Sequence, residues 1–375
     1  MNTKLRIVSL LLALVCLFSL FVGCSPTANY EWSLDELDSP ADIHTELQKQ
    51  YLLDEYTSVK SYAKGEEELS RPLPVRLLWS ATPKTDKEPS VLSYTLEIAK
   101  SRDFTDAVLY QTTDTYFDVY NLFVGTTYFW RVSAELSGGA KITSHISTFS
   151  TVENAPRNLF VEGVTNVRDL GGWATENGGT VTQGLIYRTG RMNESGSDEV
   201  VIEITERGIM TLKNELGVKT EIDLRRTDTG EVGSITSSPL GEGVAYYSIP
   251  MKYNVDNLLL DNIEAIREIF LVLGDESNYP IVYHCNIGTD RTGLLSFLIN
   301  GLAGVCEEDL YRDYLFSNFG DIGGSRSATH IQNTYVKTIK GYPGETLSEQ
   351  IKYCLIANGV SKSAIETVIR MMTEN

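Results

Sequence analysis

The sequence predicts two folded parts of different class: an all-β sandwich over residues 69–153, and an α/β domain over residues 155–375 whose mainly parallel central sheet is flanked by helices. Short segments of alternating apolar and polar residues fill the first part, and turn residues separate them. In the second part strand-like and helix-like segments alternate, which is the order that builds a parallel sheet covered by helices. A chain of 375 residues can give each part its own core.

Residues 1–23 have the pattern of a secretory signal. Lys4 and Arg6 form a short basic region ahead of an apolar run that is short for a membrane span. The run ends at Cys24 in a pattern that resembles a bacterial lipobox, although Phe21 stands where Leu is typical. We expect a lipid on Cys24 to hold an extracytoplasmic protein at the bacterial cell membrane. Ordinary signal cleavage and an uncleaved anchor are the alternatives.

The stretch that follows, residues 24–68, is polar and acidic, and we expect it to be a tether with a helix near 41–56. The whole chain carries a formal net charge of −18. This charge favours solubility and argues against nucleic acid and anionic membrane surfaces as partners. An anionic substrate therefore needs a local positive site.

The predicted sandwich rests on strand-like segments at 75–79, 92–98 and 127–133, each with a period of two residues. Trp79 lies on an early strand, and Leu122 precedes Tyr128-x-Trp130-Arg-Val, a pattern that resembles the tyrosine corner of fibronectin type III modules. The resemblance implies a spacer or binding module without catalytic residues. It identifies no ligand for the module.

The α/β prediction rests on four segments. Residues 219–224 and 280–284 are strand-like, whereas 260–273 and 294–302 have the apolar pattern of helices. The last strand and the last helix enclose His284-Cys-Asn-Ile-Gly-Thr-Asp-Arg-Thr-Gly293. In a strand–loop–helix turn of this kind the backbone N–H groups converge on one point and the helix dipole adds to the field, which suits a phosphate dianion.

The residues of this loop have the types that cysteine-based phosphate chemistry needs. Arg291 can hold two phosphate oxygens with its planar fork, and the same positive environment lowers the pKa of the Cys285 thiol. The thiolate can attack phosphorus to give a phosphocysteine that water hydrolyses, without a metal or another cofactor. Cys-x5-Arg alone is a weak signal, but the flanking His284 and the loop's Gly288 make chance improbable.

Departure of the leaving group needs a proton, so a carboxylic acid should stand beside the loop. Asp290 is the first candidate for this acid and for activating water in the second step. The alternative is a carboxylate that caps the following helix or pairs with a basic residue.

Further motifs accompany the loop, and together they resemble the bacterial tyrosine and dual-specificity phosphatases typified by the secreted mycobacterial protein tyrosine phosphatase B. The resemblance covers residues 155–375. It is carried by Asn166-x-Arg168-Asp169-Leu-Gly171-Gly172, Tyr187-Arg188-Thr189-Gly190, Ile222-Asp223-Leu224-Arg225 with Glu231 beyond, Glu308-Asp-Leu-Tyr-Arg-Asp-Tyr314 through Ser317-Asn318, and Ala357-Asn-Gly-Val360.

The resemblance implies roles for the loop residues. Cys285 becomes the nucleophile, Arg291 the phosphate ligand and Asp290 the acid. The rest of the phosphate-binding loop is Asn286, Ile287, Gly288, Thr289 and Thr292. Well-known members have Lys where this chain has Thr289, and that Lys is associated with phosphoinositide activity. Lipid substrates are therefore less expected here.

The flanking residues allow two roles. They either line the site or hold the loop from behind, and the second is the commoner role of buried Asp–Arg pairs; this set is Arg168, Asp169, Arg188, Asp223 and Arg225. Asp169 is the reserve candidate for the acid. We expect His284 to hydrogen-bond backbone near the thiolate.

These observations predict hydrolysis of phosphate monoesters, first of protein phosphotyrosine, with phosphoserine and phosphothreonine as further substrates. The partner is then a phosphorylated protein or a small phosphomonoester. An inositol-phosphate or phosphoinositide phosphatase of the same mechanism is one alternative. Such an enzyme should need many basic residues around its pocket, whereas Arg291 is the one Lys or Arg within residues 284–293. A surface-binding lipoprotein with a vestigial phosphatase domain is the alternative from another class.

Overall fold

The computed structural model describes residues 28–37, 40–54, 56–193, 204–232 and 235–374. The predicted signal over residues 1–23 and the lipidation residue Cys24 lie outside the described residues. Within the described ranges, no helix combines the length and the apolar character that a membrane crossing needs.

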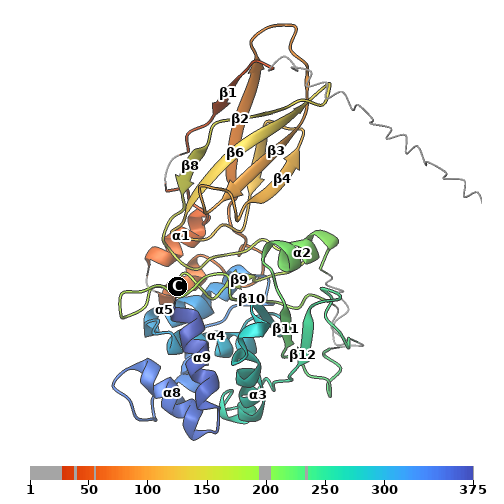
Figure 1. Cartoon of the computed structure of the whole chain (residues 1–375). Helices are drawn as coiled ribbons and strands as arrows, with labels where there is room; N and C mark the ends of the chain where they lie inside the picture. Colours follow the sequence, from red (N-terminus) through yellow and green to blue (C-terminus); the bar gives the residue numbers. More distant parts are fainter. Residues whose placement is uncertain (1–27, 38–39, 55, 194–203, 233–234, 375) are drawn as a thin grey trace, which may run out of the picture.

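Eight strands near the N-terminus form two antiparallel sheets, called the β module below (Figure 1). One sheet has the order β1-β2-β5, and the other has the order β4-β3-β6-β7 with β8 paired to β6. Alternate residues of each strand, such as Val75 and Leu77 of β2, enter one shared core. The strands are β1 Tyr30–Leu34, β2 Val75–Pro83, β3 Val91–Ala99, β4 Val108–Thr112, β5 Tyr116–Val119, β6 Thr127–Leu136, β7 Lys141–Thr143 and β8 Ser147–Ser150.

The described part of the range 24–68 is folded, which differs from the predicted tether. Its first strand, β1, pairs along its whole length with β2. The helix expected near 41–56 is present as α1 (Glu46–Leu53), followed by the 3-10 helix η1 (Tyr56–Ser61). Tyr51 of α1 is fully buried against Phe316 and Phe319 of the α/β domain. The segment is polar on average, so its composition did not indicate that a few apolar residues such as Tyr51 pack it against the α/β domain.

The α/β domain contains a five-stranded sheet of order β12-β11-β13-β10-β9. Its pairs are parallel except for β9 with β10, so the sheet is mainly parallel, as the sequence predicts. The middle strand β13 is buried throughout, and its first three residues are apolar because both faces of the strand are covered: Ile281 and Tyr283 face one core and Val282 another. The strands are β9 Arg168–Asp169, β10 Ile186–Thr189, β11 Thr220–Asp223, β12 Ala245–Ser248 and β13 Ile281–His284.

Helix α4, which follows β13, is the central helix of this domain. It packs against α5, α8 and α9, and α9 in turn packs against α3 (Figure 1). All but its first residue are buried, as the apolar pattern at 294–302 predicts. The helical segments of the domain are α2 Glu206–Met210, η2 Thr211–Glu215, η3 Leu260–Asn262, α3 Ile263–Leu273, η4 Glu276–Asn278, α4 Asp290–Leu302, α5 Glu307–Phe316, η5 Ser317–Phe319, α6 Ala328–Ile331, η6 Gln332–Val336, α7 Lys337–Ile339, α8 Leu347–Ala357 and α9 Lys362–Thr373.

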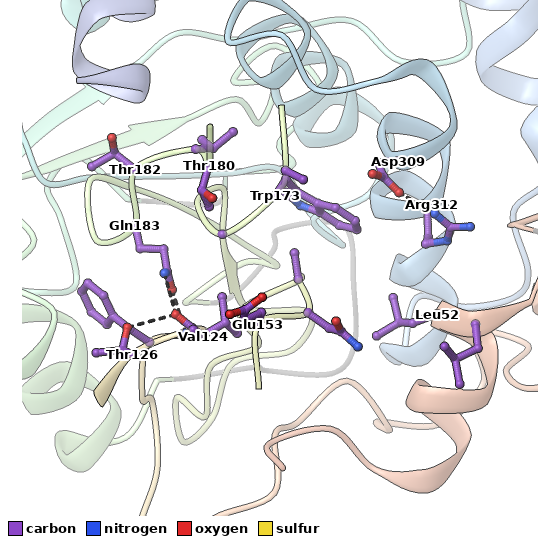
Figure 2. Close-up of a pocket in the computed structure, with 18 residues that line it drawn as sticks. Leu52, Val124, Thr126, Glu153, Trp173, Thr180, Thr182, Gln183, Asp309 and Arg312 are labelled. Carbon is purple, nitrogen blue, oxygen red and sulfur yellow. Dashed lines mark hydrogen bonds and ion pairs between the residues drawn. The ribbon is translucent and has the colours of Figure 1, made fainter. Parts of the chain in front are cut away.

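The β module and the α/β domain meet at a polar joint. The amide of Gln183 exchanges two hydrogen bonds of 3.0 Å with the backbone of Val124 (Figure 2). Beside this contact lies a cavity of about 710 Å³, lined by residues of both parts together with Leu52 of α1. Cys285 does not line this cavity, so the chemistry predicted from the sequence belongs elsewhere.

Candidate active site

Cys285 lies at the carboxyl end of β13, between the central strand and the N-terminus of α4. Parallel pairing of β13 with β10 and β11 brings the ends of three strands to this edge. The loop turns at Gly288, whose φ is +68°. A Cβ atom there would lie 2.4 Å from the carbonyl oxygen of Thr189, so the turn and the close approach both require glycine.

The main chain of the loop is available to an anion. Among the described residues, the backbone N–H groups of residues 286–289 form no hydrogen bond with the rest of the chain. The first N–H groups of α4 add the positive end of a 13-residue helix. Unpaired amides at a helix N-terminus are the usual means by which proteins bind phosphate.

The Cys285 thiol is buried, with 2% of its surface exposed. Burial opposes the thiolate, but the charge of Arg291 together with the hydroxyl and backbone N–H of Thr292 outweighs it, so the pKa of Cys285 lies below its usual value. The hydroxyl of Thr292 is buried and has no other hydrogen-bond partner among the described residues. It is free to turn toward the sulfur.

Arg291 is fixed by a buried carboxylate that the sequence did not indicate as its partner. Its two terminal nitrogens lie 2.9 and 2.5 Å from the two carboxylate oxygens of Glu231. Its guanidinium carbon also lies 5.0 Å from the ring centre of Tyr253. In the sequence Glu231 appeared only as the end of a motif, and nothing indicated that it pairs with Arg291, which lies 60 positions further along the chain.

Asp290, the first residue of α4, has the contacts of both roles considered for it. Its carboxylate accepts hydrogen bonds from the Tyr314 hydroxyl at 2.9 Å and from Nε of Arg326 at 3.2 Å. Nε2 of His330 lies 3.5 Å away. The carboxylate thus pairs with a basic residue, and it also lines the same cavity as Cys285.

This cavity has a volume of about 400 Å³. Its cationic side chains, Arg291 and Arg326, each face a carboxylate that also lines it. The apolar part of the cavity lining is formed by aromatic and aliphatic side chains of the stretch that follows β12, namely Tyr253, Val255 and Leu258. Arg326, His330 and Tyr253 were not predicted, since they lie far from the loop in sequence and belong to no motif.

Two buried arginines, Arg168 and Arg188, lie behind the loop, which is the second of the two roles considered for them. Both bind Asp313 of α5, at 2.8 and 2.6 Å. Nη2 of Arg188 then donates to the carbonyl of Gly288 at 2.8 Å. The Asn166 amide, oriented by Arg168, donates to the same carbonyl at 3.1 Å. These donors hold the loop carbonyls away from the cavity.

Thr289 is also part of this support. It is fully buried, and its hydroxyl donates to the carbonyl of Ile287 at 3.3 Å. It does not line the cavity that contains Cys285. The side chain at this position therefore packs under the loop, where a neutral hydroxyl suits the buried setting.

Asp169 lies outside the cavity, which argues against it as the reserve acid. Its carboxylate binds Arg157 at 2.7 Å and accepts from the backbone N–H groups of Gly171 and Gly184. Burial, the largest influence, raises the pKa of Asp169 despite these contacts. Arg157 also donates to the backbone of residues 121 and 122, so this pair belongs to the joint with the β module.

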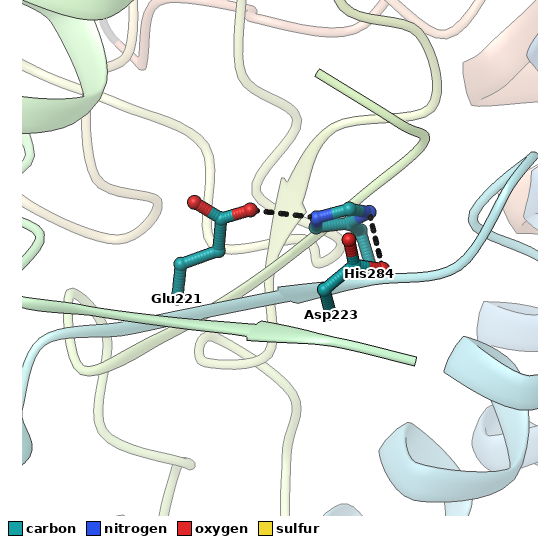
Figure 3. A group of neighbouring side chains, drawn as sticks. All are labelled: Glu221, Asp223 and His284. Carbon is teal, nitrogen blue, oxygen red and sulfur yellow. Dashed lines mark hydrogen bonds and ion pairs between the residues drawn. The ribbon is translucent and has the colours of Figure 1, made fainter. Parts of the chain in front are cut away.

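Behind Cys285, His284 lies between two buried carboxylates (Figure 3). Nε2 lies 3.0 Å from Glu221 and Nδ1 lies 3.9 Å from Asp223, while Nδ1 also contacts the carbonyl of Cys285 at 3.1 Å, the backbone contact expected for this residue. Burial lowers the pKa of His284, but Asp223 and Glu221 outweigh it and raise the pKa above its usual value. Asp223 is held at a pKa of about 2, against the effect of its burial, by His284 and Arg225.

These three side chains could in principle hold a metal ion, because their ligand atoms lie within 4.8 Å of one another. The donors are already engaged. Asp223 binds the guanidinium of Arg225 at 2.6 Å, and Glu221 accepts from Ser238 at 2.5 Å. A cation here would face the charge of Arg225, so the group is better described as a hydrogen-bonded support than as a metal site.

Known proteins resemble part of this chain. A protein of Cupriavidus necator, whose name assigns it provisionally to the tyrosine-protein phosphatases, is 25% identical over 194 residues, which cover 46% of this chain and 70% of that protein. Among solved structures, the core catalytic domain of the PP-IP phosphatase Siw14 of S. cerevisiae in complex with citrate has a TM-score of 0.28 at 19% identity, covering 45% of this chain and 91% of that one. Another Siw14 catalytic core has a TM-score of 0.26 at 18% identity, covering 36% and 71%.

The model of the tyrosine phosphatase family matches residues 159–375, more than half of the chain. The matched range includes the loop from Cys285 to Arg291, both buried arginines behind it and Glu231. By this match the chain belongs to the tyrosine phosphatase family.

Proposed function

We propose that this protein hydrolyses phosphate monoesters, with protein phosphotyrosine as the preferred class, through a phosphocysteine on Cys285. One observation carries the proposal: a thiol of lowered pKa lies beside unpaired loop amides, in a cavity with an aromatic and aliphatic side. The amides and Arg291 suit the phosphate group. Tyr253, Val255 and Leu258 suit the ring of a tyrosine ester.

In the first step the Sγ thiolate of Cys285 attacks phosphorus and the bond to the ester oxygen breaks. Asp290 gives its proton to that oxygen, so the alcohol or phenol leaves neutral. In the second step Asp290 takes a proton from water as the water oxygen attacks the phosphocysteine. Inorganic phosphate and the Cys285 thiolate result. Arg291 and the loop amides stabilise the charge on the phosphoryl oxygens in both steps.

An inositol phosphate is the second candidate substrate, because Arg326 and His330 add basic groups that the loop itself lacks. The charge balance of the cavity favours a substrate with a single phosphate group. Arg291 faces Glu231 and Arg326 faces Asp290, so a polyphosphate would have to compete with two carboxylates for two guanidinium groups. The intact loop chemistry likewise argues against a vestigial domain.

For the rest of the chain we propose a lipid-anchored, extracytoplasmic protein whose β module is of the fibronectin type III kind. The support is the lipobox-like sequence at Cys24 and the hydrogen bond from the backbone N–H of Phe123 to the Tyr128 hydroxyl, at 2.8 Å, which matches a tyrosine corner. Labelling of cells with a palmitate analogue tests the anchor. The Cys24→Ala variant should lose the label and leave the membrane fraction.

The substrate is tested with the purified chain on a panel of phosphopeptides, phosphoinositides and inositol phosphates. We expect the highest kcat/KM for phosphotyrosine peptides, and loss of all activity in Cys285→Ser with the far-UV circular dichroism unchanged. Excess EDTA should leave the rate unchanged. Full activity in Cys285→Ser would contradict the mechanism, and a preference for inositol phosphates would contradict the substrate class.

The acid is tested with Asp290→Asn. Loss of the proton donor should slow phenyl phosphate by about 100-fold or more, and p-nitrophenyl phosphate much less, because a good leaving group departs without a proton. The ratio of kcat for the two esters is the measurement. Equal losses for both esters would show that Asp290 acts by pairing with Arg326 and not by proton transfer.

A further inference from the structure

A segment near the N-terminus, residues 62–70, lies against the site although it precedes the whole family domain; we call it the strap. It follows η1 and leads into β2 of the β module. The backbone N–H of Gly65 donates to the carbonyl of Asn318 at 2.7 Å. The carbonyl of Gly65 accepts from the N–H groups of Ile322 and Gly324, at 3.1 and 2.8 Å. The backbone N–H of Leu69 donates a hydrogen bond of 2.6 Å to the carbonyl of Phe319.

The loop that the strap holds, residues 317–326, carries Arg326 to the catalytic cavity. Nη1 of Arg326 donates to the carbonyl of Gly324 at 3.0 Å, and Nε donates to Asp290 at 3.2 Å. The backbone N–H of Arg326 is fixed by the Asn318 side chain at 2.7 Å. Gly65 therefore touches the two residues, Asn318 and Gly324, that orient the partner of the proposed acid.

The strap also reaches the phosphate-binding loop by a second route. Glu68 accepts a hydrogen bond from the hydroxyl of Thr165, and the carbonyl of Thr165 accepts from the N–H of Gly190 at 2.9 Å. Gly190 lies against the loop, since a Cβ on Gly288 would come within 2.7 Å of its backbone nitrogen. Both halves of the site, the thiolate loop and the acid, are thus braced from the strap.

The strap's contact with the loop depends on glycine at position 65. Its φ is +74°, in the left-handed region. A Cβ atom would lie 2.7 Å from Cγ1 of Ile322 and 2.8 Å from the carbonyl oxygen of Gly324. A methyl group here would therefore push the backbone of the loop that carries Arg326.

We propose that the strap is part of the active site and that Gly65 is a positioning residue: through Gly324 and Arg326 it sets where the carboxylate of Asp290 stands. The inference rests on the proposed function, because it concerns the proton donor of that reaction. It extends the catalytic unit beyond residues 159–375, to a segment covalently continuous with the β module.

The test is Gly65→Ala in the full chain. We expect kcat for phenyl phosphate to fall about tenfold or more, because misplacing a catalytic group by a fraction of an ångström costs rate steeply. For p-nitrophenyl phosphate kcat should stay within about twofold, since that ester needs little help from an acid. The pH dependence of Cys285 alkylation by iodoacetate should not move, because the thiolate and Arg291 remain in place.

The control is Gly243→Ala, which carries the same backbone strain without the contact. Gly243 has a φ of +87°, and a Cβ atom there meets nothing within 4 Å. It should behave as the unaltered chain with both esters. If Gly65→Ala does not fold, as judged by circular dichroism, Arg326→Lys replaces it; this variant keeps the charge, loses the fork that spans Gly324 and Asp290, and should show the same selective loss.

The outcomes separate the two proposals. Turnover of both esters by the unaltered chain, with no selective loss in Gly65→Ala, overturns the role of the strap and leaves the phosphatase proposal standing. An equal loss for both esters, or a shifted alkylation profile, means that the strap acts on the fold or on the thiolate, and it also overturns the inference. Absence of turnover in the unaltered chain removes the proposed function and this inference with it.

Discussion

The guanidinium of Arg291 is already paired with a carboxylate of the chain itself, that of Glu231. Glu231 holds both terminal nitrogens, and Tyr253 lies under the same group. This arrangement fixes the plane of the fork, which reduces the entropy lost when phosphate binds. It also means that an incoming dianion competes with Glu231. The site is therefore suited to a single phosphoryl group aligned by the loop amides, rather than to a diffuse positive surface.

The His284 cluster gives a prediction at the same scale. A group whose folded-state pKa is raised, as that of His284 is, contributes stability below its unfolded pKa of about 6.5, and this contribution is lost as the pH rises through the folded value. Glu221→Gln removes one cause of the raised pKa. We expect this variant to lose more stability at pH 6 than at pH 9, the difference being on the order of 1 kcal/mol. Urea denaturation at the two pH values measures it.

A matched control is Glu264→Gln, since Glu264 is exposed on α3 and lies outside the cluster. Its effect should be small and equal at both pH values. If Glu221→Gln loses the same stability at pH 6 and pH 9, the carboxylate contributes shape and hydrogen bonding but does not support a charged His284.

Among the elements, α1 shows how a short polar helix can be part of a core. Its capping box at Thr45 starts the helix, and the fully buried Tyr51 docks it, with the hydroxyl donating to the carbonyl of Arg312 at 3.1 Å. The hydrophobic stripe is narrow, because only Gln48 and Tyr51 are buried. One aromatic side chain therefore supplies most of the apolar contact.

We expect Tyr51→Ala to lower the free energy of unfolding by about 3 kcal/mol, the usual cost of deleting a buried aromatic side chain. Leu53→Ala on the same helix is the control: Leu53 is 83% exposed, so the loss should be under about 0.5 kcal/mol. Urea denaturation of both variants gives the comparison. Similar small losses for the two would contradict docking of α1 in solution.

At the scale of the molecule, Arg157 joins the two folded parts. Besides its ion pair with Asp169, it donates to the carbonyls of Asn121 and Leu122 in the β module, and its guanidinium carbon lies 3.8 Å from the ring centre of Phe123. A buried cation shared in this way ties the orientation of the β module to the α/β domain. Because the contacts are polar and buried, they specify one arrangement.

Arg157→Met should cost about 3 kcal/mol or more in unfolding free energy, because Asp169 is left buried and uncompensated. Adding Asp169→Asn should recover part of this loss, since the unpaired charge is removed. Arg76→Met is the control; its ion pair with Asp118 is exposed within the β module, and its loss should be far smaller. We expect the unaltered chain to unfold in a single transition. If the double variant is no more stable than Arg157→Met, the argument from the unpaired charge of Asp169 is contradicted.

What the sequence determined by itself was local. The strand predicted at 280–284, the turn at Gly288 and the helix predicted at 294–302 follow from contiguous residues, because periodicity, glycine and the helix dipole act within a few positions. The structure has the strand at Ile281–His284 and begins the helix at Asp290. The position of a thiol beside loop amides was fixed by the same short stretch. The mainly parallel sheet followed from the order of its elements.

Tertiary structure decided which distant residues meet. No local rule relates the segments that make these contacts. They are the ion pair of Glu231 with Arg291, the ion pair of Arg326 with Asp290, and the close approach of Gly65 to residues 322 and 324. The docking of α1 escaped prediction because a single buried Tyr51 hardly changes the composition of its segment. Asp169 belongs to the same sequence motif as Arg168, which supports the loop, but in the folded chain it pairs with Arg157 at the joint between the β module and the α/β domain. The physical reason is that burial and ion pairing depend on what the fold brings close, and only the folded chain supplies that.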